Sequence, residues 1–131
     1  MSLETPGGAL QGERVGDVDR YLGLPYAAAP TGAGRWAPPA AAPAWSGVRD
    51  ATAPGPAPPQ PERPVNEWFH GPLVETDEAG ALTLNVFAPR GEGTRPVLVW
   101  LHGGGWALGW GSAPVFDGTD LAAALDAVVV T

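Results

Sequence analysis

The chain has 131 residues, the length of one small domain, and a formal net charge of −7. This acidic balance excludes nucleic acid and anionic membrane surfaces as expected partners, because both carry negative charge. No apolar run approaches the roughly 18 residues of a membrane-spanning helix, and the lack of cysteine excludes disulfides and thiolate metal sites. The two histidines, His70 and His102, do not have the spacing of zinc ligands, so we expect neither a metal nor a cofactor.

The glycine and proline content is high, with 19 and 16 residues, and such a composition can mark a disordered chain. However, eleven of the sixteen prolines lie in residues 25–64, and the chain contains six tryptophans, which disordered chains rarely have. We therefore expect a folded α/β segment preceded by a long proline-stiffened wrap. The N-terminal residues show neither the basic nor the apolar segment of a signal peptide, which favours a cytoplasmic location.

The first part of the chain predicts short strands joined by tight turns. Residues 6–16 are rich in glycine and lead into the mostly apolar residues 18–22, a pattern that indicates a marginal β-hairpin. The proline-rich stretch that follows cannot form a helix, because proline removes an amide donor and clashes with the preceding turn. Its simplest interpretation is an extended surface loop pinned by Tyr21, Tyr26 and Trp36.

Residues 61–80 show no regular period and predict a variable loop. Trp68 and Phe69 are candidates for the mouth of a substrate cleft, but ordinary packing is the stronger interpretation. Three acidic residues follow at 75, 77 and 78. Calcium would need more oxygen ligands at alternating spacing, so a solvated acidic turn is favoured.

Two strands are predicted next. Residues 81–88 alternate apolar and other side chains and stop at Pro89, which indicates a strand. Residues 97–101 (Val-Leu-Val-Trp-Leu) are mostly β-branched or aromatic, which is typical of a short strand buried on both faces. With a turn at residues 91–94 between them, the two strands are expected to form a hairpin that feeds the central sheet.

The strand at 97–101 runs directly into His-Gly-Gly-Gly at residues 102–105. Successive glycines can adopt φ > 0 and let another group approach bare backbone N–H donors. Open α/β sheets bind ligands beyond the carboxyl end of a strand, which is where this loop lies. A phosphate-binding loop is disfavoured, because the segment has no Gly-Lys-Ser/Thr ending and no Gly-x-Gly-x-x-Gly opening a helix. Trp106 and Trp110, which follow, are expected to pack beside the site.

The last residues predict a helix and a strand. Residues 117–125 indicate a short helix with Asp117 or Thr119 as its N-cap, and residues 127–131 indicate a further buried strand. A strand, a helix and a strand in succession imply a right-handed parallel crossover.

Several of these segments resemble the carboxylesterase type B family, the cholinesterase-like branch of the α/β-hydrolases. The resemblance covers Tyr-Leu-Gly-Leu-Pro-Tyr-Ala at residues 21–27, Arg35-Trp36, residues 45–52, Gly55-Pro56, Pro59-Gln60, Leu-Thr-Leu-Asn-Val at residues 82–86 and the His-Gly-Gly-Gly loop. It implies an α/β fold that forms the N-terminal part of an α/β-hydrolase, with a small hairpin, a proline-rich wrap and the start of a mixed central sheet.

The resemblance also implies how the domain is divided and where the chain departs from the family. We expect residues 1–131 to form one partial domain, with small strands at 1–24, the wrap and loop at 25–80, and the first strands of the sheet with the glycine loop at 81–131. The family carries Ser-Glu-Asp-Cys before the Leu-x-Leu-Asn-Val strand, where this chain has Glu-Ala-Gly-Ala at residues 78–81, and the second cysteine would fall at Pro58. The absence of both cysteines fits an intracellular setting, whereas loss of the acidic pair removes carboxylates that brace the site.

By the same resemblance, the glycine loop is the oxyanion hole of a serine esterase. Backbone N–H groups there stabilise the negative oxygen of the tetrahedral intermediate, and Gly104 and Gly105 would supply two of them. His102 and Gly103 would position the loop, and Trp106 would contact a small-molecule ester substrate. The third donor would be the residue after the nucleophile.

The sequence lacks that nucleophile. Its serines, Ser2, Ser46 and Ser112, are not flanked by glycines as in Gly-x-Ser-x-Gly. The expected function is therefore that of a carboxylic ester hydrolase by family, with this chain supplying the oxyanion loop and inactive alone. The open alternatives are a non-catalytic cholinesterase-like binding protein, an inactive fragment, an independent binding module, and a hormone-sensitive-lipase-like esterase, which Gly-Leu-Pro-Tyr at residues 23–26 disfavours.

Overall fold

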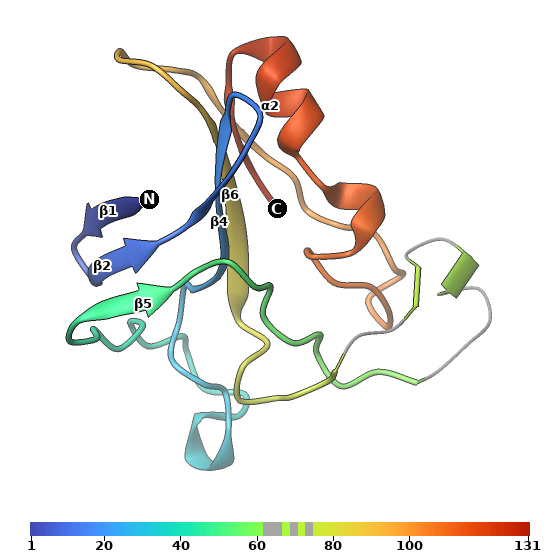
Figure 1. Ribbon diagram of the computed structural model, residues 1–131. Coiled ribbons are helices and arrows are strands. Elements are labelled where there is room, and N and C mark those ends of the chain that lie inside the picture. Colours follow the sequence, from blue (N-terminus) through green and yellow to red (C-terminus); the bar gives the residue numbers. More distant parts are fainter. Residues whose placement is uncertain (62–66, 69–70, 73–74) are drawn as a thin grey trace.

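The computed structural model describes residues 1–61, 67–68, 71–72 and 75–131. These residues form a three-stranded sheet and a mixed five-stranded sheet, with a helix lying across one face of the larger sheet (Figure 1). No helix in this part of the chain is long and apolar enough to cross a membrane. A mixed sheet covered by a helix confirms the predicted α/β class.

The N-terminal hairpin is confirmed. Strands β1 (Ser2–Thr5) and β2 (Gly8–Gln11) pair antiparallel across a tight turn, and β5 (Val48–Asp50) pairs parallel with β2 to complete the small sheet. Gly8 has φ +135, and a Cβ there would lie 2.7 Å from the Trp45 indole nitrogen, so the position requires glycine. The same indole donates a hydrogen bond of 2.8 Å to a carbonyl of β2, which ties the segment before β5 to the hairpin.

A second hairpin opens the larger sheet. Strands β3 (Glu13–Val15) and β4 (Val18–Pro25) pair antiparallel, and β4 continues antiparallel along β6 (Thr83–Pro89). The β4–β6 register shifts around Gly23, whose φ is +65 and whose missing Cβ would lie 2.8 Å from the carbonyl oxygen of Ala53. The larger sheet therefore takes strands from the N-terminal segment as well as from the C-terminal one, and the division into three parts stays a prediction.

The strand order at the other edge of the sheet differs from the expected hairpin. Strand β8 (Val128–Val130) lies between β6 and β7 (Val97–Val99), antiparallel to β6 and parallel to β7. The predicted direct pairing of the strands at 81–88 and 97–101 is therefore wrong, because β8 occupies the place between them. The predicted parallel connection is confirmed, since β7 leads through helix α2 (Thr119–Leu125) to β8.

The ends of α2 are set by local backbone geometry. Gly118 is the N-cap, so the prediction of Asp117 or Thr119 is wrong by one residue; Asp117 instead accepts a hydrogen bond of 2.9 Å from the Thr119 N–H. Asp126 ends the helix in the left-handed conformation, with φ 46, and its N–H donates to the carbonyl of Ala122.

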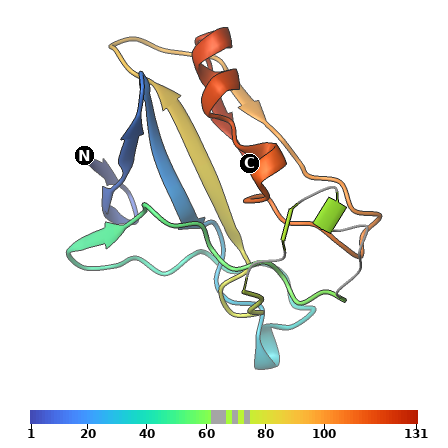
Figure 2. The same ribbon diagram turned by 45° about the vertical axis from the view of Figure 1, so that its right-hand side comes forward.

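The larger sheet buries a different core on each face. Figure 2 shows α2 and the small sheet on opposite sides of β4 and β6. Ala122 of α2 packs on Val18, Leu22, Phe87 and Val129 of the sheet, with Leu98 packed against them. On the opposite face lie Leu10, Tyr21 and Ala51, with Leu24, Trp45 and Val86 packed against them. The alternation of β4 side chains between these cores is the expected period of a strand.

Strand β7 is covered on one face only. Leu98 packs against the core under α2, whereas Val97 and Val99 are 61% and 62% exposed. Trp100 and Leu101, just beyond the strand, are also exposed. The prediction of a strand buried on both faces is therefore wrong for the described residues, because the layer under α2 is the only one that reaches β7 there.

The aromatic residues expected to pin the wrap behave differently from one another. Tyr21 is buried, but Tyr26 is half exposed and Trp36 is 97% exposed with φ 65, so the prediction holds for Tyr21 alone. The wrap is instead held by Arg35, whose Nη2 donates to Glu78 Oε2. This pair joins the wrap to Glu78, the first of the four residues that stand where the family has Ser-Glu-Asp-Cys.

Candidate active site

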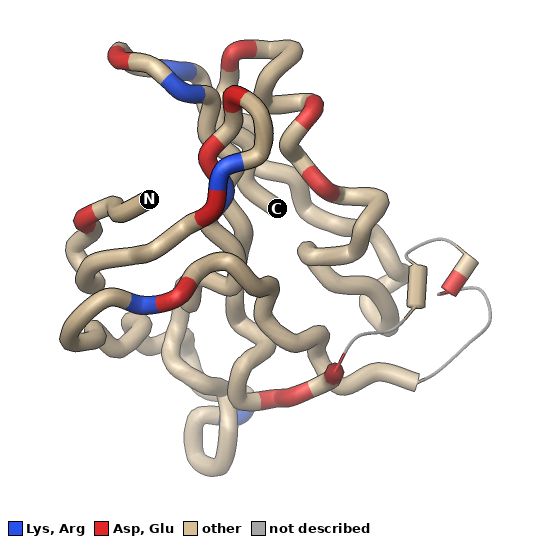
Figure 3. The backbone as a smooth tube through the Cα atoms, in the orientation of Figure 1, with Lys and Arg blue, Asp and Glu red and all other residues tan. Residues whose placement is uncertain are grey.

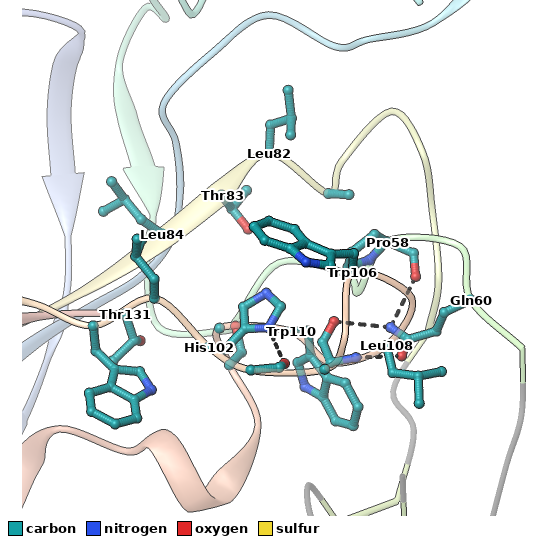
Figure 4. Close-up of a pocket in the computed structure, with 18 of the residues that line it drawn as sticks. Pro58, Gln60, Leu82, Thr83, Leu84, His102, Trp106, Leu108, Trp110 and Thr131 are labelled. Carbon is teal, nitrogen blue, oxygen red and sulfur yellow. Dashed lines mark hydrogen bonds between the residues drawn. The ribbon is translucent and has the colours of Figure 1, made fainter.

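A cleft of about 780 Å³ opens beyond the carboxyl end of β7 (Figure 4). Residues 99–112 form one wall, and residues 81–84 and the proline-rich stretch 56–60 form others. None of the described residues that line the cleft is an aspartate, glutamate or arginine. Charged residues cluster at the β3–β4 and β6–β7 turns and along α2, and others lie on β5 and at residues 75–78 (Figure 3). The described cleft wall is therefore largely apolar.

The glycines of the loop are required by its geometry. Gly104 and Gly105 have φ +144 and +61, and Gly109 has φ +95. A Cβ on Gly104 would lie 1.7 Å from the carbonyl oxygen of Leu108, a distance that no side chain can occupy. The loop closes on itself there, because the Gly104 carbonyl accepts hydrogen bonds from the N–H groups of Ala107 and Leu108 at 3.2 and 3.1 Å.

The backbone N–H groups of Gly104 and Gly105 make no hydrogen bond within the described part of the chain. Each of these N–H groups shares a peptide plane with a carbonyl that is hydrogen-bonded within the loop. Gly103 O bonds the His102 ring, and Gly104 O bonds the N–H groups of Ala107 and Leu108. All described peptide bonds are trans, so each N–H points opposite to the carbonyl of its plane. The loop therefore presents two adjacent N–H groups that are aimed away from its own hydrogen bonds.

His102 anchors the loop by a short local contact. Its Nδ1 lies 2.9 Å from Gly103 O, and because a carbonyl can only accept, Nδ1 is the donor in this bond. The exposed imidazole stacks on Phe116, with ring centroids 6.4 Å apart and an interplanar angle of 29°. This geometry agrees with the expected positioning role of His102, which stays a prediction.

The two tryptophans of the loop differ in burial. Trp110 is 2% exposed and packs with Ala57 and Ala113, as expected for a residue beside the site. Trp106 has φ 62 and is fully exposed, so its expected packing is not found among the described residues. The left-handed backbone turns its indole out of the loop and over the cleft (Figure 4), and its contact with substrate stays a prediction.

A model of the carboxylesterase family matches residues 1–131. The chain belongs to the carboxylesterase family. It is 40% identical over 121 residues to the fumonisin B1 esterase of Sphingopyxis macrogoltabida, which covers 90% of this chain and 21% of that protein. It is 38% identical over 130 residues to the para-nitrobenzyl esterase of Bacillus subtilis (strain 168), which covers 98% of this chain and 26% of that protein.

Other relatives agree on the fold. A solved structure of PNB esterase superposes with a TM-score of 0.92 at 39% identity, over 99% of this chain and 27% of that one. Neuroligin-3 of Mus musculus is 33% identical over 174 residues, covering 99% of this chain and 21% of that protein. The chain thus spans about a quarter of the length of these relatives, and its sheets form the corresponding part of an α/β-hydrolase.

Within this carboxylesterase segment, the sequence did not single out Gln60 as a site residue. Its Oε1 accepts a hydrogen bond from the Gly109 N–H at 2.8 Å, and its Nε2 donates to the carbonyls of Gly109 and Pro58, each at 3.2 Å (Figure 4). Gln60 therefore connects the proline-rich wrap with the glycine loop. In the sequence Gln60 stands out only as a glutamine among prolines and as the last residue of the family-like Pro59-Gln60 step.

Asn85 was also missed as a site residue. Only 2% exposed, it accepts a hydrogen bond from the Gly23 N–H and donates to the hydroxyls of Ser112 and Thr131, each at 3.1 Å. It thereby joins β4, the end of the glycine loop and the end of β8. The alternation of the strand places Asn85 on the face of Thr83 and opposite Leu82, Leu84 and Val86, so the pattern does not mark it as a buried polar residue.

The remaining sequence candidates lie elsewhere. Trp68 is 80% exposed and is not among the described residues that line the cleft. Phe69 and His70 lie outside the described residues. The described residues contain no group of three His, Asp or Glu side chains that could hold a metal ion.

Proposed function

We propose that this chain supplies the oxyanion-binding loop of a serine carboxylesterase. The observation that carries the proposal is the pair of N–H groups on Gly104 and Gly105, which have no acceptor in the described residues and line the cleft. When a serine attacks an ester carbonyl, the carbonyl oxygen becomes negative, and fixed N–H donors stabilise it. Each such donor is worth roughly 2.7–4 kcal/mol of the activation barrier.

The lining of the cleft favours an uncharged ester. The described lining residues include no carboxylate and no guanidinium, and Trp100, Trp106 and Leu82 give them an apolar character. A charged acyl or alcohol group would lose its hydration there without gaining an ionic partner. We therefore propose small neutral esters as the substrate class.

The nucleophile, base and acid would come from sequence beyond residues 1–131. Ser112 does not suit the role of nucleophile, because its hydroxyl accepts the Asn85 amide at 3.1 Å and the described residues place no histidine base on it. A serine held in a Gly-x-Ser-x-Gly turn would attack the substrate, and a histidine oriented by an acidic residue would take its proton.

A second candidate is a non-catalytic, cholinesterase-like binding protein. It rests on the 33% identity over 174 residues with neuroligin-3 of Mus musculus, a relative whose name does not contain the word esterase. Such a protein could retain the loop as a structural element while lacking the nucleophile elsewhere.

A chimera tests the esterase proposal. Residues 1–131 replace the matching segment of para-nitrobenzyl esterase, and hydrolysis of p-nitrophenyl butyrate is measured. We expect an active chimera in which Gly104→Ala lowers kcat by about 10²–10³ with little change in KM, because the new Cβ displaces the loop that holds the donors.

The matched control is Gly93→Ala, which also places a side chain at positive φ, +113, but in open space away from the cleft. It should leave kcat unchanged. A folded chimera without activity, or equal activity in the Gly104→Ala and Gly93→Ala variants, would contradict the proposal. Residues 1–131 alone should not hydrolyse the ester; turnover blocked by a serine-directed inhibitor would show that they do.

A further inference from the structure

We propose that Gln60 is a positioning residue that aims the oxyanion donors from the proline-rich wrap. The inference rests on the proposed function of the glycine loop and assigns the part that holds this loop in place. Gln60 lies 49 residues before Gly109 in the chain, yet it makes two hydrogen bonds with that residue's backbone.

The first step is the grip on Gly109. The Gln60 amide accepts the N–H of Gly109 at 2.8 Å and donates to its carbonyl at 3.2 Å. A further bond of 3.2 Å to the Pro58 carbonyl fixes the amide in its own segment. A carboxamide carries an acceptor oxygen and a donor NH2 group on one uncharged side chain, which matches the N–H and the carbonyl of one residue. Both backbone polar groups of Gly109 are therefore held by one side chain.

The second step runs from Gly109 to the donors. A Cβ on Gly109 would lie 2.5 Å from Gly103 O and 2.9 Å from His102 Nδ1. The Cα of Gly109 therefore lies directly against the hydrogen bond between these two groups. Gly103 O shares a planar peptide with the N–H of Gly104. The position of Gly109 therefore limits the direction in which the Gly104 N–H can point.

The third step involves the next peptide. The Gly104 carbonyl accepts the N–H groups of Ala107 and Leu108, and Leu108 is bonded in sequence to Gly109. This carbonyl shares its plane with the Gly105 N–H. A shift of Gly109 would move Leu108 and release this carbonyl, so both donors depend on the same anchored residue.

The wrap is a stiff base for this grip. Pro59 and Pro61 flank Gln60, and a proline both fixes its own φ and restricts the residue before it to extended backbone. Ala57, fully buried, pairs with the segment at residues 75–77 through its N–H and its carbonyl, at 2.9 and 3.0 Å. The segment that carries Gln60 is therefore already stiff and anchored, so holding the loop costs little additional conformational entropy.

The first experiment compares two glutamine variants of the 131-residue chain by ¹⁵N-edited NMR. Gln60→Met keeps the length of the side chain and removes all three hydrogen bonds. Gln11→Met is the matched control, because Gln11 is exposed on β2 and, among the described residues, its amide bonds only the neighbouring Gly12 carbonyl, at 3.1 Å. We expect the amide resonances of Gly104 and Gly105 to move in Gln60→Met and to stay in place in Gln11→Met.

A second variant remains informative if Gln60→Met folds poorly. In Gln60→Glu the protonated carboxyl can accept the Gly109 N–H and donate one hydrogen bond to the Gly109 carbonyl, whereas the carboxylate can only accept. The two facing carbonyl oxygens repel the carboxylate and raise the pKa of that carboxyl from the ordinary glutamate value of about 4.3, while the Gly109 N–H, which bonds the carboxylate, opposes this shift. The glycine resonances should therefore return to wild-type positions as the pH falls through this pKa, a reversal that lost packing would not give.

The activity of the esterase chimera separates the two proposals. We expect Gln60→Met to lower kcat by about tenfold to a hundredfold with KM nearly unchanged, as for a displaced catalytic geometry. If Gly104→Ala lowers kcat and Gln60→Met does not, the positioning role is overturned and the oxyanion loop stands. If Gly104→Ala has no effect, the oxyanion proposal fails. Unmoved Gly104 and Gly105 resonances in Gln60→Met overturn the positioning role whatever the activity.

Discussion

At the scale of single residues, Asn85 ties more of the structure together than any glycine of the loop. Its side chain satisfies Gly23 N–H and the hydroxyls of Ser112 and Thr131, while its N–H and carbonyl pair with Thr131 at 2.9 and 3.1 Å. All of these contacts lie at a position that is 2% exposed. A buried amide of this kind fixes one arrangement of three segments, because each partner would lose a hydrogen bond in any other.

Replacing this amide should be costly. We expect Asn85→Ala to lower the free energy of unfolding by about 2–3 kcal/mol, because it leaves the Gly23 N–H without an acceptor in a buried place. Ser112→Ala removes only one neutral hydrogen bond and should cost about 1 kcal/mol. Urea unfolding followed by tryptophan fluorescence measures both. Equal losses in the two variants would mean that Asn85 does not join the three segments.

How much of the site the sequence can predict depends on how far apart the interacting residues lie along the chain. His102 and the glycines are adjacent, so a buried-type strand followed by His-Gly-Gly-Gly was enough to locate the loop. Gln60 and Gly109 are 49 residues apart, and Gly23 and Asn85 are 62 apart. Such pairs depend on how the wrap and the strands come together, and no local pattern encodes that.

At the scale of elements, β4 separates the two cores, and its buried Tyr21 makes the stability of the fold depend on pH. Tyr21 faces the small sheet and is 5% exposed. Burial raises the pKa of Tyr21 above its ordinary value, the charge of Asp19 raises it further, and Arg14 opposes the shift. The unfolded chain therefore loses this proton at lower pH than the folded one, and the folded state loses stability as the pH rises through and above about 10.

Tyr21→Phe should remove this alkaline loss. The ring still packs with Leu10 and Ala51, so we expect little change in stability at pH 7. Between pH 9 and about pH 11 the urea midpoint of the wild type should fall more steeply than that of the variant. Parallel curves for the two proteins would show that ionisation of Tyr21 is not coupled to unfolding.

The elements themselves were easier to predict than their neighbours in the sheet. The alternation at residues 81–88 and the β-branched run at 127–131 indicated strands, and both are found. Sequence proximity favoured a hairpin between the strands that became β6 and β7, yet the valines of β8 pair with both. Hydrophobic pattern gives the period of a strand, but the order of strands depends on which connection best covers the faces of the sheet.

At the scale of the whole molecule, charge and apolar surface are separated. Many of the acidic and basic residues lie at the turns and on α2 (Figure 3), whereas β7, at the edge of the sheet, carries the exposed Val97 and Val99. The pairing continues past the strand, since Trp100 N–H donates to the Val130 carbonyl at 2.8 Å. An exposed apolar edge strand is a template for pairing with another chain. The net charge of −7 opposes such association but does not act at the edge itself.

A charge placed on this edge should therefore act on association and leave folding intact. Val97→Lys puts a solvated ammonium on the uncovered face of β7, where the side chain is 61% exposed, so we expect less self-association and an unchanged unfolding midpoint. Leu98→Lys, one residue along, turns the same charge into the core beneath α2 and should abolish cooperative unfolding. Sedimentation velocity and thermal melts distinguish the two effects. Neighbouring residues of a strand face opposite sides of the sheet. Similar behaviour of both variants would therefore mean that β7 is not covered on the Leu98 face and exposed on the Val97 face.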